Sequence, residues 1–358
     1  MKKIDWYIIK KFLGTFAFVL GLFVIISVVI DFSERVDDFL DSGASVGRVL
    51  LHNYLPFCLF FGNQLSPFLV FLSVIWVASR MAQQTELVAI LSAGVSFNRM
   101  LRPFLIAGVF IMMAILLAGH FLIPVTNRVK FDFDREYIFG SHNFGRKIYR
   151  EIQPGNIYFF DWIDEEKQLG YHFSKETWEN EQLVEKIIAS RARFNPEDST
   201  WTLIDAQVRR IAAFGDEQIQ DFGTLDTALN MGLDNFGRPS EVIRNQITPQ
   251  LYDYREAELK AGATTIADID IEIHSRTARA FTILILTFIG ATLASRKSRG
   301  GMGVPILLAV IIAAVFLFTE RITQVAAIKV GFPVLLAVWV PNVIFSMVSL
   351  AIYRRAPK

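Results

Sequence analysis

The stretch FLGTFAFVLGLFVIISVVI, residues 12–30, decides the fold of this chain. It carries no charged side chain, and its length is close to the ~20 apolar residues with which a helix crosses ~30 Å of hydrocarbon. Similar runs recur in two groups towards the two ends of the chain. They cover residues 12–30, 55–79, 101–124, 277–295, 303–319 and 333–353. The sequence therefore predicts six membrane-spanning helices, three on each side of a long polar segment.

The composition fits a polytopic membrane protein. Hydrophobic residues make up 53% of the 358, and the 32 Phe are concentrated in the apolar runs. A net charge of +1 without a basic run argues against a nucleic-acid partner. Cys58 is the only cysteine, which excludes an intrachain disulfide and a cysteine-based metal site. The basic N-terminus resembles a signal peptide, but no small-residue cleavage site follows the first run, so we expect an uncleaved helix.

Charges between the runs predict the topology. The segments before the first run, between the second and third, between the fourth and fifth, and after the sixth are basic, whereas the loop after the first run is acidic. The basic residues are Lys2, Lys3, Lys10, Lys11, Arg80, Arg99, Arg102, Arg296, Lys297, Arg299, Arg354, Arg355 and Lys358, and the acidic ones are Asp31, Glu34, Asp37, Asp38 and Asp41. The positive-inside rule then places both termini in the cytoplasm and residues 125–270 outside it. In a diderm bacterium this means an inner-membrane protein with a periplasmic middle domain.

The middle segment, residues 125–270, has the pattern of an all-β domain. Apolar and polar residues alternate over several short runs, with turn residues between them at 195–198 and 215–216, and this favours an antiparallel β-sandwich or jellyroll. The runs are 148–152, 156–160, 183–189, 201–205 and 207–211. Residues 249–274 instead predict a helix leading back to the membrane. His142 and His172 are isolated and are interpreted as surface or strand residues rather than ligands.

The stretch SRMAQQTELVAILSAGVS, residues 79–96, is too short and polar to span a membrane. Thr85 is positioned to cap a short helix over 86–92, and Gly94 to end it in a left-handed turn. One interpretation is an ordinary interfacial helix at the cytoplasmic face. The other is a coupling helix that docks in a groove of a motor protein, with Glu86 as the one charged contact on an apolar plug.

The segment Glu86–Ser96 resembles the coupling-helix motif of the LptF/LptG (YjgP/YjgQ) permease family. The resemblance extends to the Pro-x-x-x-x-x-Trp-x-Pro-Asn pattern at Pro333–Asn342, to Ile273–Arg276 before the fourth span, and to the basic, glycine-rich loop Ser295–Gly301. It covers nearly the whole chain. It implies three domains: 1–124 with a coupling helix near 84–94, a jellyroll-like domain at 125–270, and 271–358 with the last three spans.

Members of that family are transmembrane subunits of an ABC transporter that extracts lipopolysaccharide from the inner membrane. The resemblance therefore implies a second LptF/LptG-like subunit, a cytoplasmic ABC ATPase dimer and a periplasmic bridge of similar jellyrolls as partners. It also implies a non-catalytic chain that binds no cofactor, because ATP and Mg²⁺ sit on the ATPase. The residues implied to couple to the ATPase, and so to move helices one and five, are Glu86, Leu87, Ala93 and Gly94.

Family members place basic residues near the periplasmic ends of the helices, where guanidinium groups grip lipid phosphates. The lipid-binding candidates here are Arg35, Arg128, Lys130, Arg135 and Arg321. The chain departs from the family at the end of helix one, because Asp31 and Glu34 accompany Arg35. For Arg321 the preferred interpretation is an internal pair with Glu320.

Two other functions fit parts of the sequence. A mechanotransmission protein of the ABC type would also use a coupling helix, but would move its periplasmic domain without carrying lipid. A membrane-embedded lipid enzyme needs converging acids, histidines or nucleophiles, and the acidic loop 31–41 has neither a histidine nor a nucleophile beside it. His120, near the end of the third span, is interpreted as structural, and Pro67 as a possible kink in the second.

Overall fold

The computed structural model describes residues 3–138, 148–153, 155–164, 167–179, 182–196, 198, 200–211, 217–227, 229, 239–260, 265–295 and 301–354. The chain forms two compact units. The first, the helical unit, comprises residues 1–37, 47–127 and 270–358; the second, the β unit, comprises 38–46 and 128–269. Among the predicted features, His142, the turn at 215–216, the basic residues at 296–299 and both ends of the chain lie outside the described residues.

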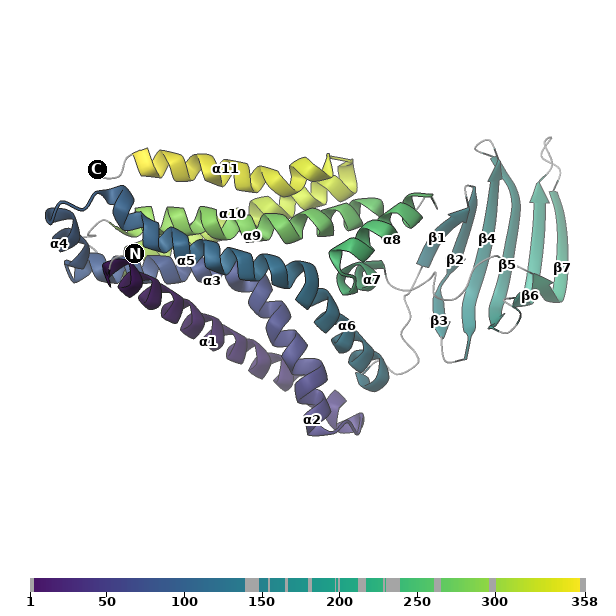
Figure 1. Ribbon diagram of the computed structural model, residues 1–358. Coiled ribbons are helices and arrows are strands. Elements are labelled where there is room, and N and C mark those ends of the chain that lie inside the picture. Colours follow the sequence, from purple (N-terminus) through teal and green to yellow (C-terminus); the bar gives the residue numbers. More distant parts are fainter. Residues whose placement is uncertain are drawn as a thin grey trace. The chain divides into compact units, whose positions relative to one another are not determined.

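Within the described residues, six helical stretches are long and apolar enough to cross a membrane (Figure 1), which confirms the predicted spans. Two of them, the second and the third, contain π-helical turns, labelled η, and the second also has a short preceding helix. The elements are α1 (Lys3–Asp41), α2 (Val46–Arg48), η1 (Val49–Tyr54), α3 (Leu55–Gln83), α4 (Glu86–Ser92), α5 (Phe97–Leu117), η2 (Ala118–Leu122), α6 (Ile123–Phe133), η3 (Asp134–Ile138), α9 (Ile266–Ala294), α10 (Gly303–Val330) and α11 (Val334–Arg354).

The helices overrun the apolar runs from which they were predicted. Residues 31–41, expected as an acidic loop, continue α1 to Asp41, and the third span continues through η2 and α6 to Ile138. Hydropathy marks only the part of a helix that lies in hydrocarbon, whereas a polar extension needs only helix-forming residues and a packing partner. One such contact joins the rings of Phe39 and Phe133, whose centroids are 6.4 Å apart. The loop prediction for 31–41 was therefore wrong.

The core of the helical unit lies where α9 packs against α3 and α5. Gly290 of α9 allows a close approach, because a Cβ there would stand 3.0 Å from Val74 and 3.1 Å from Phe71. Gly108 of α5 faces Thr287 of α9 in the same way. Small residues commonly let membrane helices approach closely. The Asn342 amide of α11 adds a polar link, donating to the Ala278 carbonyl oxygen of α9 at 2.9 Å.

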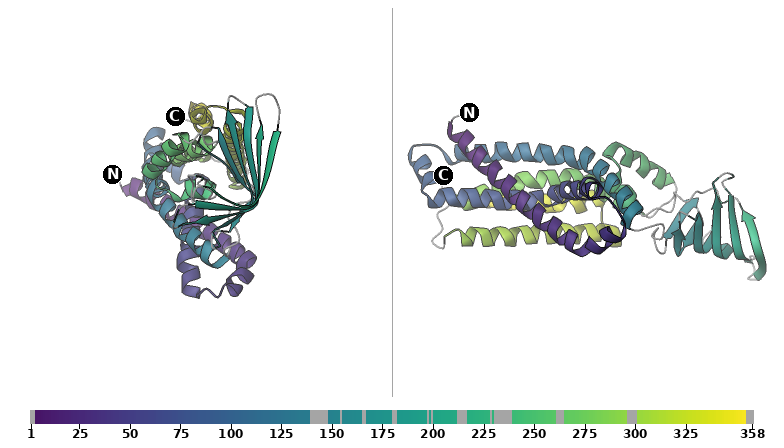
Figure 2. Two further views of the ribbon diagram at one scale, coloured as in Figure 1. Left: turned by 90° about the vertical axis from the view of Figure 1, so that its right-hand side faces the viewer. Right: turned by 90° about the horizontal axis from the view of Figure 1, so that it is seen from below.

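The β unit is built on one antiparallel sheet. Its strands are β1 (Ile148–Gln153), β2 (Asn156–Phe160), β3 (Trp162–Asp164), β4 (Leu169–Glu179), β5 (Gln182–Asn195), β6 (Thr200–Ile211) and β7 (Glu217–Thr227), followed by helices α7 (Pro239–Asn245) and α8 (Thr248–Lys260). The sheet order is β1-β2-β4-β5-β6-β7, with β3 also paired to β4. Figure 2 shows in its left view that the long strands bend, so the sheet curls.

One face of this curved sheet carries the core of the unit. Phe160, Phe173, Trp201 and Leu203 are fully buried there. The predicted inserted all-β, jellyroll-like domain is confirmed. The described strands form one curved sheet rather than two separate ones, and the predicted strands 201–205 and 207–211 are a single strand, β6. His172 lies exposed on β4, with its Nδ1 3.8 Å from the carboxylate of Asp161.

Candidate functional site

The short helix α4 follows α3 across a sharp corner, at the end of the helical unit where α1 begins and α11 ends (Figure 1). Gly94 has φ +80°, so it ends the α4 segment in the left-handed turn that the sequence predicted. Thr85 does not cap the helix as expected. The corner places Thr85 itself in the left-handed region, at φ 59°, and its hydroxyl donates to the Gln84 carbonyl oxygen at 2.7 Å. A capping residue needs extended backbone to reach the first helical N–H groups, so this geometry removes the cap.

The two faces of α4 differ in burial. Leu87 is only 1% exposed and belongs to the core cluster of the helical unit, with Ile90 and Leu91 packed beside it. Its side chain therefore anchors α4 to the other helices instead of facing outward. The outer face is made of small or apolar residues that are exposed: Val88, Ala89, Ser92, Ala93 and Gly94.

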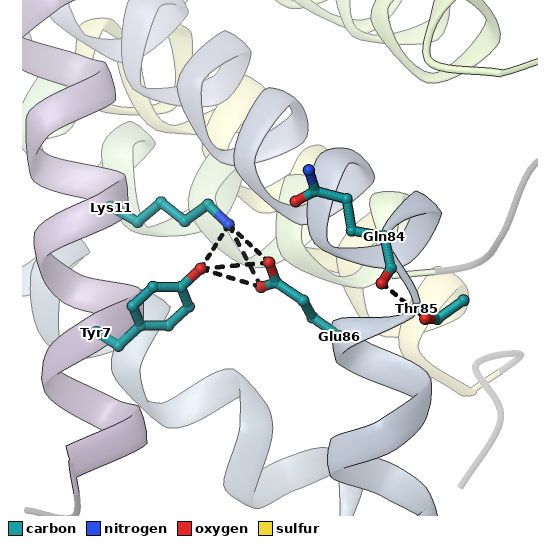
Figure 3. A network of polar contacts seen from close by, with 5 residues as sticks. All are labelled: Tyr7, Lys11, Gln84, Thr85 and Glu86. Carbon is teal, nitrogen blue, oxygen red and sulfur yellow. Dashed lines mark hydrogen bonds and ion pairs between the residues drawn. The ribbon is translucent and has the colours of Figure 1, made fainter.

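Glu86 is held by the first helix. Its two carboxylate oxygens accept hydrogen bonds from the Tyr7 hydroxyl at 3.2 and 3.3 Å, and both lie 3.3 Å from Lys11 Nζ. Lys11 also donates to the Tyr7 hydroxyl oxygen at 2.9 Å. Figure 3 shows the two α1 side chains pointing together towards Glu86. We call this group of Tyr7, Lys11 and Glu86 the α1–α4 joint. The Glu86 side chain remains 30% exposed.

A second ion pair fastens α1 close to the joint. Arg99 of α5 donates to the Asp5 carboxylate of α1 at 2.6 Å, and the Asp5 side chain is only 8% exposed. The Tyr353 hydroxyl of α11 donates to the Asn98 side-chain oxygen of α5. Polar contacts thus connect α1, α4, α5 and α11 at one end of the helical unit.

The predicted lipid-binding residues lie in different surroundings. Arg35 of α1 pairs with Asp31 at 3.6 Å, and Lys130 of α6 pairs with Asp134 at 2.7 Å. Arg128 and Arg135 are exposed. Arg35 and Arg321 belong to the helical unit, and Arg128, Lys130 and Arg135 belong to the β unit.

The expected Glu320–Arg321 pair was wrong. Both side chains contact Gln324 instead, with Arg321 Nη1 3.4 Å from the Gln324 side-chain oxygen and Gln324 Nε2 3.3 Å from the Glu320 carboxylate. Consecutive residues on a helix point in different directions, whereas residues three or four apart lie side by side.

Sequence reasoning missed a buried arginine. The Arg276 side chain of α9 is 3% exposed, and its Nε donates to the Glu272 carboxylate at 2.9 Å. Nearby, His120 of η2 hydrogen-bonds Thr277 of α9 at 3.2 Å. The i,i+4 spacing of Glu272 and Arg276, beside an apolar span, was the signal that could have identified the pair.

A protein-family model matches the chain over nearly its whole length. The family described as the lipopolysaccharide export system permease LptF/LptG matches residues 6–355. The match extends from α1 to the end of α11, so it includes α4, the joint and the β unit. No individual curated protein matches the chain.

Proposed function

The chain belongs to the LptF/LptG family of lipopolysaccharide export permeases, and from this premise we propose that it is a transmembrane subunit of an ABC transporter. In this proposal it extracts lipopolysaccharide from the inner membrane. A separate cytoplasmic ATPase hydrolyses ATP and holds the Mg²⁺, so this chain is the non-catalytic part that turns hydrolysis into lipid movement.

The observation that carries the proposal is the two-faced helix α4. Leu87 anchors it from within, and its exposed outer face of small residues suits insertion into a groove of another protein. Ala93 and Gly94 allow a close approach, and Glu86 keeps part of its carboxylate accessible. One chain offers one such helix, whereas ABC motors act in pairs. A second LptF/LptG-like subunit would supply the other helix.

The positive-inside rule supports a cytoplasmic location for α4 and both termini. The β unit then lies in the periplasm, where it would pass lipid to a bridge of similar jellyrolls. Among the basic candidates, Arg128, Arg135 and Arg321 are exposed and can therefore reach a lipid phosphate. Arg35 and Lys130 already have carboxylate partners, which lowers the net charge that they present.

A pull-down in detergent tests the function. Wild type, Glu86→Ala and, as a matched control, Glu34→Ala would each be purified, and the bound proteins and lipids identified by mass spectrometry. Glu34 is an exposed carboxylate of α1, at the opposite end of that helix from the joint. We expect an ABC ATPase and lipopolysaccharide with wild type and the control, and much less ATPase with Glu86→Ala.

Other results would change the conclusion. Recovery of the ATPase without lipid would favour the mechanotransmission function. Recovery of no ATPase by wild type would contradict both functions. Equal recovery by all three proteins would remove Glu86 from the docking contact.

A further inference from the structure

We propose that Tyr7 and Lys11 are positioning residues that transmit docking on α4 to helix α1. The inference rests on the proposed function, because it takes α4 as the docking helix. It adds that the α1–α4 joint makes Glu86 a shared carboxylate: α1 holds it from one side while the partner binds it from the other.

The geometry of the joint fixes Glu86 more firmly than one ion pair would. Tyr7 and Lys11 are one helical turn apart and therefore lie on the same face of α1. Each reaches both carboxylate oxygens, and the two are also bonded to each other at 2.9 Å. Three groups that each bond the other two resist rotation of the carboxylate. A change in the position of α4 is therefore passed to α1.

The joint leaves room for a partner. An ionised carboxylate has about four acceptor positions, and Tyr7 and Lys11 supply only part of the donors that these positions accept. The Glu86 side chain is 30% exposed, so a donor of the docked protein can bind it while α1 stays attached. Docking therefore need not break the joint.

The packing of α1 makes this joint important. Ile8, Ile9 and Phe12 at its start are buried in the core of the helical unit, and Asp5 pairs with Arg99. By contrast, no residue in the most apolar window of the α1 span is fully buried within the chain. Helix α1 is thus most deeply buried at its base and makes lighter contacts beyond it, such as that between the Phe23 and Phe68 rings. A displacement of α4 is therefore passed first to the base of α1.

The first experiment needs no partner. Spin labels are placed at Ile4→Cys of α1 and Val88→Cys of α4, both exposed, in a Cys58→Ser background, and their distance distribution is measured in detergent. We expect a narrow distribution that broadens or shifts in Lys11→Gln and Tyr7→Phe. The control Lys10→Gln, whose Nζ lies over the Trp6 ring, leaves it unchanged. An unchanged distance distribution in Lys11→Gln would show that Lys11 does not hold α4 in place relative to α1.

The second experiment measures transmission in the transporter reconstituted with its ATPase. Lys11→Gln should keep ATPase recovery within about twofold of wild type, because the ion pair is partly exposed. Lipid released per ATP hydrolysed should fall about fivefold or more, the size of a typical coupling between sites. Lys10→Gln should match wild type in both.

Two results would contradict the proposal that Lys11 transmits docking on α4 to α1. One is unchanged lipid release per ATP in Lys11→Gln. The other is loss of the ATPase from Lys11→Gln as complete as from Glu86→Ala, since Lys11 would then build the docking surface itself. Failure of the proposed function is distinguishable from both, because wild type would then recover no ATPase while the spin-label distances still report whether the joint exists.

Discussion

The two ends of helix α1 use their charges differently. At its start, Lys11 and Asp5 pair with Glu86 and Arg99, which lie 75 and 94 residues away in other helices. Towards its end, Arg35 pairs with Asp31, one turn away in the same helix. A pair between helices fixes their relative position, whereas a pair within one helix supports only that helix. The charges at the start therefore connect α1 to other helices, whereas the Asp31–Arg35 pair joins two residues of α1 itself.

Burial is a second variable, independent of distance along the chain. The Glu272–Arg276 pair has the same i,i+4 spacing as Asp31–Arg35, but the Arg276 side chain is 3% exposed and that of Arg35 is 30% exposed. Because both pairs join residues one turn apart in a single helix, a difference between their contributions to stability reports the effect of burial.

Glu272→Gln should have the largest effect on stability. It removes the carboxylate charge that pairs with the buried Arg276 guanidinium at 2.9 Å, and breaking a buried pair in this way costs about 3 kcal/mol. The free energy of unfolding, measured by SDS titration of the full chain, tests this. Arg35→Gln is the matched control and should cost less than about 1 kcal/mol, because its pair is more exposed. Equal losses would show that burial does not distinguish the two pairs.

Arg99→Gln should have the next largest effect, about 2 kcal/mol, because the Asp5 carboxylate is nearly buried and loses the charged donor that lies 2.6 Å away. The same SDS titration measures the loss. Arg102→Gln serves as the control, since Arg102 is an exposed arginine of the same helix. If both variants cost the same, the pair between α1 and α5 does not stabilise the helical unit, and the contrast between the two ends of α1 fails.

The sequence predicted the spans and strands better than the contacts between them. Six apolar runs identified the six spans because hydrocarbon requires an unbroken apolar surface. The ends of α1 and of the third span were missed, since residues 31–41 and 125–138 are helical without being apolar. The i,i+4 spacing of Glu272 and Arg276 was readable, but nothing in a single sequence brings Lys11 next to Glu86. Such pairs depend on how the helices pack.

A pair between strands extends the comparison to the β unit. Lys186 of β5 donates to Glu176 of β4 at 2.8 Å, and this hydrogen bond holds the pKa of Glu176 below its ordinary 4.5. Lys186→Met should cost about 0.5 kcal/mol at neutral pH, as is typical of cross-strand pairs. The stabilisation is complete above the ordinary pKa and is lost as the pH falls through the lowered pKa.

Hydrogen exchange of β4 and β5 amides, corrected for the intrinsic effect of pH, measures this loss. Wild type should exchange more slowly than Lys186→Met at pH 7, and the difference should shrink as the solution is acidified below pH 4.5. Lys175→Met controls for the loss of a positive charge, because Lys175 is a lysine of the neighbouring strand β4. A difference that grows on acidification would contradict the pairing.

Arg128→Gln should have the smallest effect on stability, below about 0.5 kcal/mol, because the side chain is exposed and no ion pair joins it within the described residues. Its effect on bound lipid should nevertheless exceed that of Lys130→Gln. Asp134 already neutralises much of the Lys130 charge, so removing Lys130 takes less positive potential from the surface. Lipopolysaccharide recovered per mole of protein distinguishes the two variants. If Lys130→Gln loses more lipid, a cation with a partner in the same helix still binds phosphate, and local pairing does not predict which charges remain available to a ligand.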